Sequence, residues 1–240
     1  MKKLTGLLLI LLAAQTMQSQ TKEGTITYEQ KIDMYRRIPE DNAQLRSMMP
    51  QFRTAKYELL FADSQTLFKA LEEAPDMTEE NHGGVIMRFN SGAVTQFYRN
   101  FSKKLSTETR DLVEETYLIE DSIRSLTWKL ADGETKVILG YTCKKATGKT
   151  ERGSDIVAWY CEDIPVSGGP EQFNGLPGMI LSIDANKGEI VFTATAINKK
   201  VEAKKIKAPT KGKKISSAEF VKKQKELFGN QPGGVRVVTN

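Results

Sequence analysis

The 240-residue sequence contains few of the residues from which most catalytic and metal-binding sites are built. It has one histidine and two cysteines, so Ser–His–Asp arrangements, Cys–His arrangements and metal-ligand clusters have few candidate residues. It also lacks the glycine-rich phosphate-binding loop that ends in Lys and Ser or Thr. With 39% hydrophobic and 27% charged residues, the composition is that of a globular domain and excludes collagen-like, coiled-coil and disordered chains. We therefore expect no catalytic residue, no metal and no cofactor.

Long hydrophobic runs are also missing after the first 20 residues. Residues 1–20 begin with Met1-Lys2-Lys3, continue with an uncharged apolar run over 4–14 and end in a polar stretch. This order predicts a secretory signal peptide, because about 11 apolar residues are too few for a membrane-spanning helix, which takes about 20. No cysteine follows the run, which argues against a lipid anchor. We expect an exported protein of the periplasm or outer membrane, with an extracellular location also open.

The charge is unevenly distributed along the chain. The net charge is +5, but residues 199–225 hold 11 Lys against 2 Glu, a local +9, and residues 21–198 hold 21 basic against 27 acidic residues, a net −6. A basic segment can bind nucleic acid, which an exported protein rarely meets, so no nucleic-acid partner is expected. Two interpretations remain for Lys199 to Lys225. One is peripheral contact with an anionic membrane surface or an acidic partner, and the other is a solvated lysine-rich surface.

The two cysteines are placed symmetrically in an expected hairpin. Residues 141–147 and 155–164 have the pattern of strands, and a polar loop with two glycines joins them. If the hairpin is centred near Arg152, Cys143 and Cys161 face each other. A disulfide is then geometrically allowed, and it would stabilise the exported protein by roughly 3 kcal/mol. A metal site or a reactive thiol is the alternative, and the lack of a nearby histidine makes it weak.

Short alternating runs separated by turn signals predict a mainly β fold. We expect a curved antiparallel meander sheet, a half-barrel that is LolA-like by analogy, with one or two short helices, one of them within 41–51. A C-terminal helix is predicted from Ser216 to Phe228, with a serine cap and Gly229 after its end. The predicted organisation is a signal peptide over 1–20, a single antiparallel β domain over 21–198, and a Lys-rich linker, short helix and tail over 199–240. Strands are expected at 25–34, 53–61, 66–71, 85–89, 93–101, 112–120, 125–130, 141–147, 155–164, 179–184 and 189–198.

The most unusual segment runs from Ile164 to Ile180 and is rich in glycine and proline. Within it, residues 176–179 suit a type II turn, because proline presets φ at the second position and Gly178 supplies a positive φ at the third. Gly175 lets the backbone approach closely, and Met179 is expected to open a strand. No residue in the segment is an evident nucleophile. The pattern therefore predicts a sharp, buried turn.

The last part of this segment resembles the hallmark motif of the GLPGLI family of exported bacterial proteins. Residues 139–146, 158–160 and 163–165 precede the motif in the family's order and spacing, and methionine stands where the family name has its second leucine. The resemblance implies export to a Gram-negative envelope, a mostly β fold and an outer-membrane or periplasmic partner, such as a TonB-dependent transporter. It implies no activity, and whether the motif is functional or only a structural turn is left open. The motif residues are Gly175, Leu176, Pro177, Gly178, Met179 and Ile180.

Aromatic and apolar residues near the motif are the candidate binding residues. Trp159 and Tyr160 could line an apolar pocket together with the apolar residues of the motif segment, although a place in the core is the simpler interpretation. The same default applies to Trp128. His82 lies at the end of an acidic loop over 72–84, where a cation site is conceivable, but the spacing matches no calcium or zinc motif. The candidate binding residues are Trp159, Tyr160, Phe173, Leu176 and Met179.

Three classes of function fit these features. The first is a non-enzymatic envelope protein that binds a partner, most plausibly as an accessory subunit of an outer-membrane complex, through a sheet edge or the Lys-rich segment. The second is a periplasmic carrier of a lipid or another hydrophobic ligand. The third is a hydrolase that uses an unrecognised carboxylate pair. A filled core with an exposed apolar edge favours the first class, a large apolar cavity the second, and a cleft with two facing carboxylates the third.

Overall fold

The computed structural model describes residues 20–228 and 236–239, apart from 39, 48, 72–79, 83, 84, 89, 90, 113, 151 and 152. Side chains at 45, 80–82, 85–88, 91–94, 228 and 236–239 are not described either. The predicted signal peptide, apart from Gln20, and the side chain of His82, for which a cation site was the alternative to a solvated loop, therefore lie outside the description. Within it, no helix is long and apolar enough to cross a membrane. The described residues also contain no group of three or more His, Cys, Asp or Glu that could hold a metal ion.

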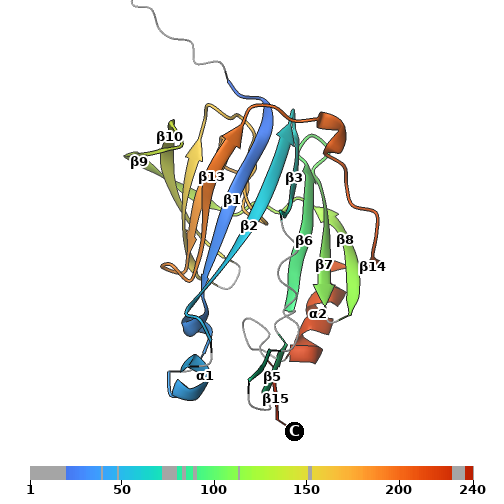
Figure 1. Ribbon diagram of the computed structural model, residues 1–240. Coiled ribbons are helices and arrows are strands. Elements are labelled where there is room, and N and C mark those ends of the chain that lie inside the picture. The colour runs from blue at the N-terminus through green and yellow to red at the C-terminus, as the bar shows by residue number, and fades with distance from the viewer. Residues whose placement is uncertain are drawn as a thin grey trace, which may run out of the picture.

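A twelve-stranded curved sheet forms the body of the molecule, as the predicted mainly β fold requires (Figure 1). Its strands lie in the order β14-β8-β7-β6-β3-β2-β1-β13-β12-β11-β10-β9. A second, three-stranded sheet has the order β15-β5-β4. The strands of the large sheet are β1 (Glu23–Asp33), β2 (Phe52–Ala62), β3 (Gln65–Ala70), β6 (Ser91–Asn100), β7 (Leu105–Leu112), β8 (Glu115–Ser122), β9 (Trp128–Ile138), β10 (Tyr141–Lys149), β11 (Asp155–Cys161), β12 (Met179–Ala185), β13 (Ile190–Asn198) and β14 (Lys213–Ile215). Those of the small sheet are β4 (Glu80–His82), β5 (Val85–Arg88) and β15 (Arg236–Thr239).

The large sheet consists of two meanders joined side by side. One runs from β1 to β8 and the other from β9 to β13, and the first strand of one pairs antiparallel with the last strand of the other, from Thr25↔Asn198 to Ile32↔Ile190. All neighbours are antiparallel except β14, which pairs parallel with β8. The predicted meander therefore holds within each half, while β1 and β13 close the junction. The sheet ends at β14 on one side and at β9 on the other.

Alternation along β2 assigns the two faces of the sheet. Leu59 and Phe61 belong to the main core, whereas Leu60 and Ala62 belong to a second core, and consecutive side chains of a strand point to opposite faces. We call these the inner and the outer face. The main core on the inner face contains Tyr28, Phe68 and Phe192. The ring centroid of Phe68 lies 6.4 Å from that of Tyr28 and 6.2 Å from that of Phe192.

A C-terminal helix covers one end of the inner face. The helix α2 (Ser217–Phe228) begins with a capping box, in which the Ser216 hydroxyl accepts from the Glu219 amide at 3.2 Å and the Glu219 carboxylate accepts from the Ser216 amide at 3.0 Å. Its Phe220 is 2% exposed and packs edge-on against Tyr117 of β8 at 5.7 Å. The predicted helix is therefore confirmed. The shorter helical segments are α1 (Ala43–Ser47), η1 (Met34–Arg37) and η2 (Ala203–Lys205).

The Lys-rich segment that follows residue 198 packs against the β domain. Ile206 is 6% exposed and belongs to the outer-face core with Leu60, Leu67 and Tyr98. The chain then forms the edge strand β14 and continues into α2. The buried side chain of Ile206 therefore anchors the segment, and the lysines around it lie on the surface of the folded domain.

Candidate functional site

The connection between β11 and β12, residues 162–178, packs onto the inner face of the sheet. The Tyr28 hydroxyl donates to the carbonyl of Ile180 at 2.5 Å, and the Trp128 indole donates to the carbonyl of Asn174 at 2.8 Å. The ring of Phe173 lies 6.3 Å from that of Phe192. We call residues 162–178 the motif loop, because they carry most of the glycine- and proline-rich motif. The loop fills the inner face with its own apolar side chains.

Four of the five candidate binding residues are part of the core. Tyr160, Phe173, Leu176 and Met179 are at most 3% exposed and lie in the main cluster. Only Trp159 is partly buried, with the Lys136 ammonium 5.8 Å from its ring. The structure therefore places four of these side chains in the core, which is the simpler of the two interpretations given above. They are apolar because they hold the motif loop on the sheet.

The turn at Pro177 is tighter than the predicted type II turn. The Gly178 amide donates to the Leu176 carbonyl at 2.8 Å, whereas the Met179 amide donates to the carbonyl of Ile164 at 2.9 Å. A hydrogen bond across one residue defines a γ-turn, and a proline φ suits its inverse form. Gly178 has the predicted positive φ, +153°. The main requirement for glycine is space, since an added Cβ would overlap the Cys161 carbonyl oxygen and lie 2.6 Å from its carbonyl carbon.

The hairpin that carries the cysteines has the predicted register. Lys144 pairs with Tyr160 and Lys149 with Asp155, so continuation of the register by one residue sets Cys143 opposite Cys161. The predicted disulfide is not formed in the structure, where both are free, buried thiols. Burial, as the main cause, raises the pKa of the Cys143 thiol to about 12, and it also raises the pKa of the Cys161 thiol. The disulfide stays a prediction about the exported, oxidised protein.

Mass mapping of the mature protein under oxidising, non-reducing conditions is expected to find Cys143 linked to Cys161. After reduction, both thiols are expected to react with iodoacetamide at pH 8 only at the rate of unfolding, because burial keeps them protonated and inaccessible. Rapid alkylation of both cysteines in the native, unreduced protein would contradict the pairing.

Polar and charged side chains meet the motif loop where it crosses the middle of the sheet. The Gln30 amide donates to Glu171 at 3.4 Å and its oxygen accepts from the Tyr57 hydroxyl at 3.2 Å. On β7, Arg110 pairs with Glu108 at 3.1 Å. Burial, with a further contribution from Glu108, raises the pKa of Glu171, while Arg110 opposes the shift. Burial followed by the charge of Glu171 raises the pKa of Tyr57 to about 12.

Arg99 is the largest fully buried side chain, with 1% exposure. Its guanidinium donates to the backbone carbonyls of Gly169 and Glu171 and lies 4.0 Å from the ring of Phe97. Burial lowers its pKa, and the nearby Glu108 and Glu171 charges oppose that shift. A guanidinium stays charged at neutral pH, so this contact sets a buried cation against loop carbonyls. Arg99 thus holds the motif loop on β6, a role that sequence patterns did not indicate.

Replacement of Glu171 by Gln is expected to raise the stability of the protein at neutral pH. Burial raises the pKa of the Glu171 carboxyl in the folded protein, so the folded state binds a proton more readily than the unfolded chain. The folded protein therefore loses stability as the pH rises above the pKa that this carboxyl has in the unfolded chain. Glutamine removes that loss and keeps an acceptor for Gln30. Urea unfolding should give similar free energies for the two proteins near pH 4 and a higher value for Glu171→Gln at pH 7. A larger gap at low pH than at neutral pH would contradict the assignment.

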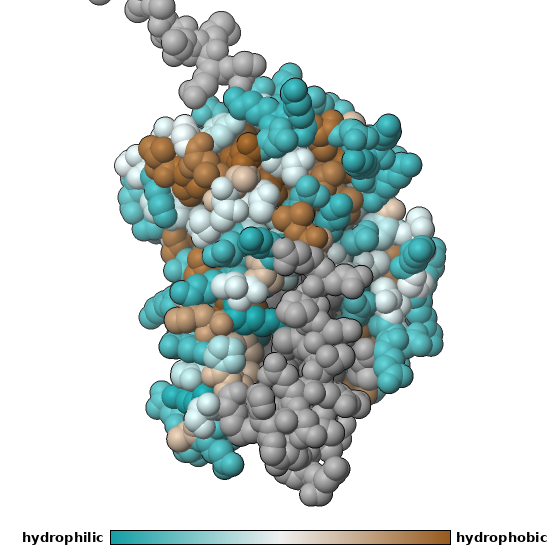
Figure 2. Space-filling model, viewed as in Figure 1, coloured by the Kyte–Doolittle hydropathy of each residue, from teal (hydrophilic) through white to brown (hydrophobic). Residues whose placement is uncertain are grey.

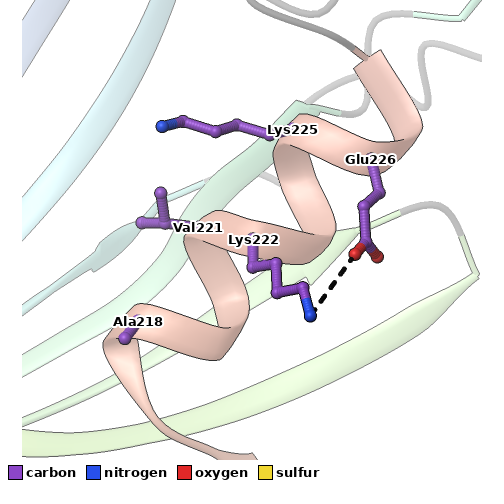
Figure 3. A pocket seen from close by; sticks show the side chains of 5 residues that line it. All are labelled: Ala218, Val221, Lys222, Lys225 and Glu226. Atoms are coloured by element: carbon purple, nitrogen blue, oxygen red, sulfur yellow. Dashed lines mark ion pairs between the residues drawn. The ribbon is translucent and has the colours of Figure 1, made fainter.

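Two surface pockets lie outside the core, one along α2 and one at the β1–β2 connection. One, of about 420 Å³, lies along α2 and is lined by Ala218, Val221, Lys222, Lys225 and Glu226. Figure 3 shows Val221 and Lys225 on one side of the helix, and Lys222 with its ion-pair partner Glu226, 3.9 Å away, on the other. The second, of about 600 Å³, lies at the β1–β2 connection. Its lining residues are Tyr35, Arg36, Arg37, Ile38, Glu40, Arg46 and Gln51.

The β9 end of the sheet carries exposed apolar side chains. Leu130 is 50% exposed, Val137 is 69% exposed, and Leu139, in the turn after the strand, is 45% exposed. In Figure 2, hydrophobic surface gathers at the upper left, the side on which Figure 1 places β9 and β10. Within the described residues, β9 pairs with β10 alone, and the pairing is interrupted between Leu130 and Thr135. Its outer backbone groups are therefore available for another strand.

Comparisons with known proteins support the fold and the special status of the motif region. A family model described as a protein of unknown function, Porph_ging, matches residues 148–182. Crystal structures of PNGF-II in space groups C2 and P21 are similar, each with a TM-score of 0.54 and 16% identity over 84% of this chain. The chain spans about a third of their length, 32% and 33%. No curated protein sequence matches significantly. At this identity the likeness concerns the fold alone.

Proposed function

We propose that this protein is an exported envelope protein of the GLPGLI type that works by binding another protein, as an accessory subunit of an outer-membrane complex. The motif over 175–180 supports the family assignment, and it falls inside the segment that the Porph_ging model matches. The N-terminal charge and hydropathy pattern supports export. A TonB-dependent transporter is the partner that the family resemblance suggests.

The observation that carries this proposal is the contrast between the filled inner face and the exposed β9 edge. The motif loop fills the inner face with Phe173 and Leu176, whereas β9 exposes Leu130 and Val137 along a sheet edge. A partner strand could pair with the outer backbone groups of β9 while Leu130 and Val137 contact its side chains. The irregular pairing of β9 opposes indiscriminate edge-to-edge association, which suits a specific partner.

The other two classes have weaker support. A carrier needs an apolar cavity, and the described inner face is occupied by the protein's own loop. A hydrolase is the second candidate because Glu108 faces the inner side of the sheet near Glu171, and burial raises the pKa of Glu171. Both carboxylates, however, are engaged by neighbouring side chains, Glu108 by Arg110 at 3.1 Å and Glu171 by Gln30 at 3.4 Å.

The lysines of 199–225 would add a general electrostatic attraction for an acidic partner or an anionic membrane surface. Most are exposed, so salt screens this attraction over about 8 Å at physiological ionic strength. Binding through β9 should therefore persist at high salt, and any contribution of the lysines should be lost.

Affinity capture from envelope extracts tests the proposal. The bait is the mature protein, compared with a Leu130→Glu, Val137→Glu double variant and with Val221→Glu, Leu227→Glu, a control that places the same two charges on apolar residues 46% and 42% exposed on α2. We expect one outer-membrane protein to be captured by the wild type and by the control, and at least tenfold less of it by the β9 variant. Equal capture by all three baits would refute the β9 assignment. Substrate turnover without any stable partner would refute binding as the function.

A further inference from the structure

The β1–β2 connection forms a second charged site, separate from β9 and from the motif loop. The pocket of about 600 Å³ there is lined by three arginines and one glutamate, with Ile38 and Tyr35 as its apolar part. Ile38 is 4% exposed, so the pocket rests on a buried side chain. Three guanidinium groups around one depression is an arrangement that charge repulsion disfavours unless an anion joins them.

Two of the three guanidinium groups, those of Arg36 and Arg46, are held in place by backbone carbonyls. Nη1 of Arg36 donates to the carbonyls of Asn186 and Lys187 at 2.6 and 2.7 Å. Nη2 of Arg46 donates to the carbonyls of Tyr35 and Ile38 at 3.2 and 3.0 Å. These contacts fix the two side chains, and within the described residues the other N–H groups of these guanidinium groups donate no further hydrogen bond. A ligand would therefore meet a preorganised set of donors.

One of the unused donors is already removed from water. Nε of Arg46 is buried and has no hydrogen-bond partner among the described residues. An unsatisfied buried donor of a charged group costs about 1–3 kcal/mol or more, and a bound acceptor would recover that loss. Arg37 has one acidic contact, Glu189 at 3.3 Å through Nε, which leaves its two terminal nitrogens.

We propose that this pocket binds a phosphate group. The lining carries three positive charges and one negative charge, Glu40, and Glu189 pairs with Arg37, so a local net charge of +1 remains to attract an anion. Phosphate also offers enough acceptor oxygens for several guanidinium forks, the geometry for which arginine is suited. The phosphate could belong to a soluble compound or to a lipid headgroup at the envelope surface.

Titration of the mature protein with inorganic phosphate, followed by calorimetry and by the NMR signals of the arginine Nε–H groups, tests the site. Saturable binding is expected, with a shift of the Arg46 signal. Affinity should fall at least tenfold in Arg46→Gln and in Arg36→Gln. Arg36 is exposed, so the second variant should fold even if the first does not. Arg46→Lys should also bind weakly, because lysine keeps the charge and loses the fork.

The matched control is Arg124→Gln, which removes the same charge from the exposed β8–β9 connection. Flotation with vesicles of phosphatidic acid in phosphatidylcholine, against phosphatidylcholine alone, distinguishes the two sources. Binding to the acidic vesicles that inorganic phosphate displaces assigns the pocket to a lipid headgroup, and binding of free phosphate without flotation assigns it to a soluble phosphate compound. Absence of saturable phosphate binding, or equal losses in Arg36→Gln and Arg124→Gln, would overturn the proposal.

Discussion

Gly178→Ala is expected to destabilise the protein by about 3 kcal/mol or more. Two effects add at this position. The added Cβ would overlap the carbonyl group of Cys161 and lie 3.0 Å from the Cα of Glu162, and all these atoms belong to backbone that cannot rotate away. Overpacking typically costs about 1–3 kcal/mol, and a positive φ costs a residue with a Cβ a further 1–2 kcal/mol or so. Urea unfolding followed by circular dichroism measures the difference.

The control for this prediction is Gly188→Ala. Gly188 has a φ of +88°, and a Cβ built there meets no atom within 4 Å, so only the backbone term applies and the loss should be about 1 kcal/mol. Asn and Val at 178 should both be as harmful as Ala, because the Cβ itself collides. If Asn at 178 were tolerated as well as Ala at 188, backbone conformation alone would explain the glycine, and the close approach to Cys161 would be unimportant.

The elements that sequence predicted best are those that local signals determine. The capping box at Ser216 and Glu219 marks the start of α2, and the spacing of the cysteines gives the register of the β10–β11 hairpin. The strand β7 gives no clear sequence signal, because its inner face carries Glu108 and Arg110 in place of alternating apolar residues. Pairing of β1 with β13 is also invisible locally, since it joins residues more than 150 positions apart.

The candidate sites were harder to predict, for two physical reasons. Apolar residues around a motif look the same whether they line a pocket or fill a core, and here Phe173 and Leu176 fill it. The hydrogen-bond acceptors of the buried Arg99 guanidinium lie in a loop some 70 residues away in sequence. The one usable signal was an arginine directly after the apolar pair Phe97-Tyr98. The arginine pocket had a clearer signal, Arg36-Arg37 at a strand end, but its third arginine joins only through the fold.

Truncation before Lys199 is expected to abolish cooperative folding. The segment removed contains Phe220, 2% exposed against Tyr117, and Ile206, 6% exposed against Leu60. Loss of a buried Phe or Ile to alanine alone costs about 3–5 and 2–5 kcal/mol, and domains of this kind are stable by only about 5–15 kcal/mol. Thermal unfolding and amide NMR dispersion of the truncated protein check this. A sharp, near-native transition would mean that the segment is a dispensable tail.

This outcome decides how the lysines have to be tested. If truncation unfolds the β domain, loss of binding by a truncated protein says nothing about charge. Substitution by glutamine is the informative change, at exposed lysines that make no ion pair in the described part of the chain, namely Lys200, Lys207, Lys211 and Lys223. The quadruple variant should keep wild-type stability within about 1 kcal/mol, since exposed charges contribute little. Weaker partner binding at low salt, with no change at high salt, would then assign the electrostatic attraction to the lysines and the salt-independent remainder to β9.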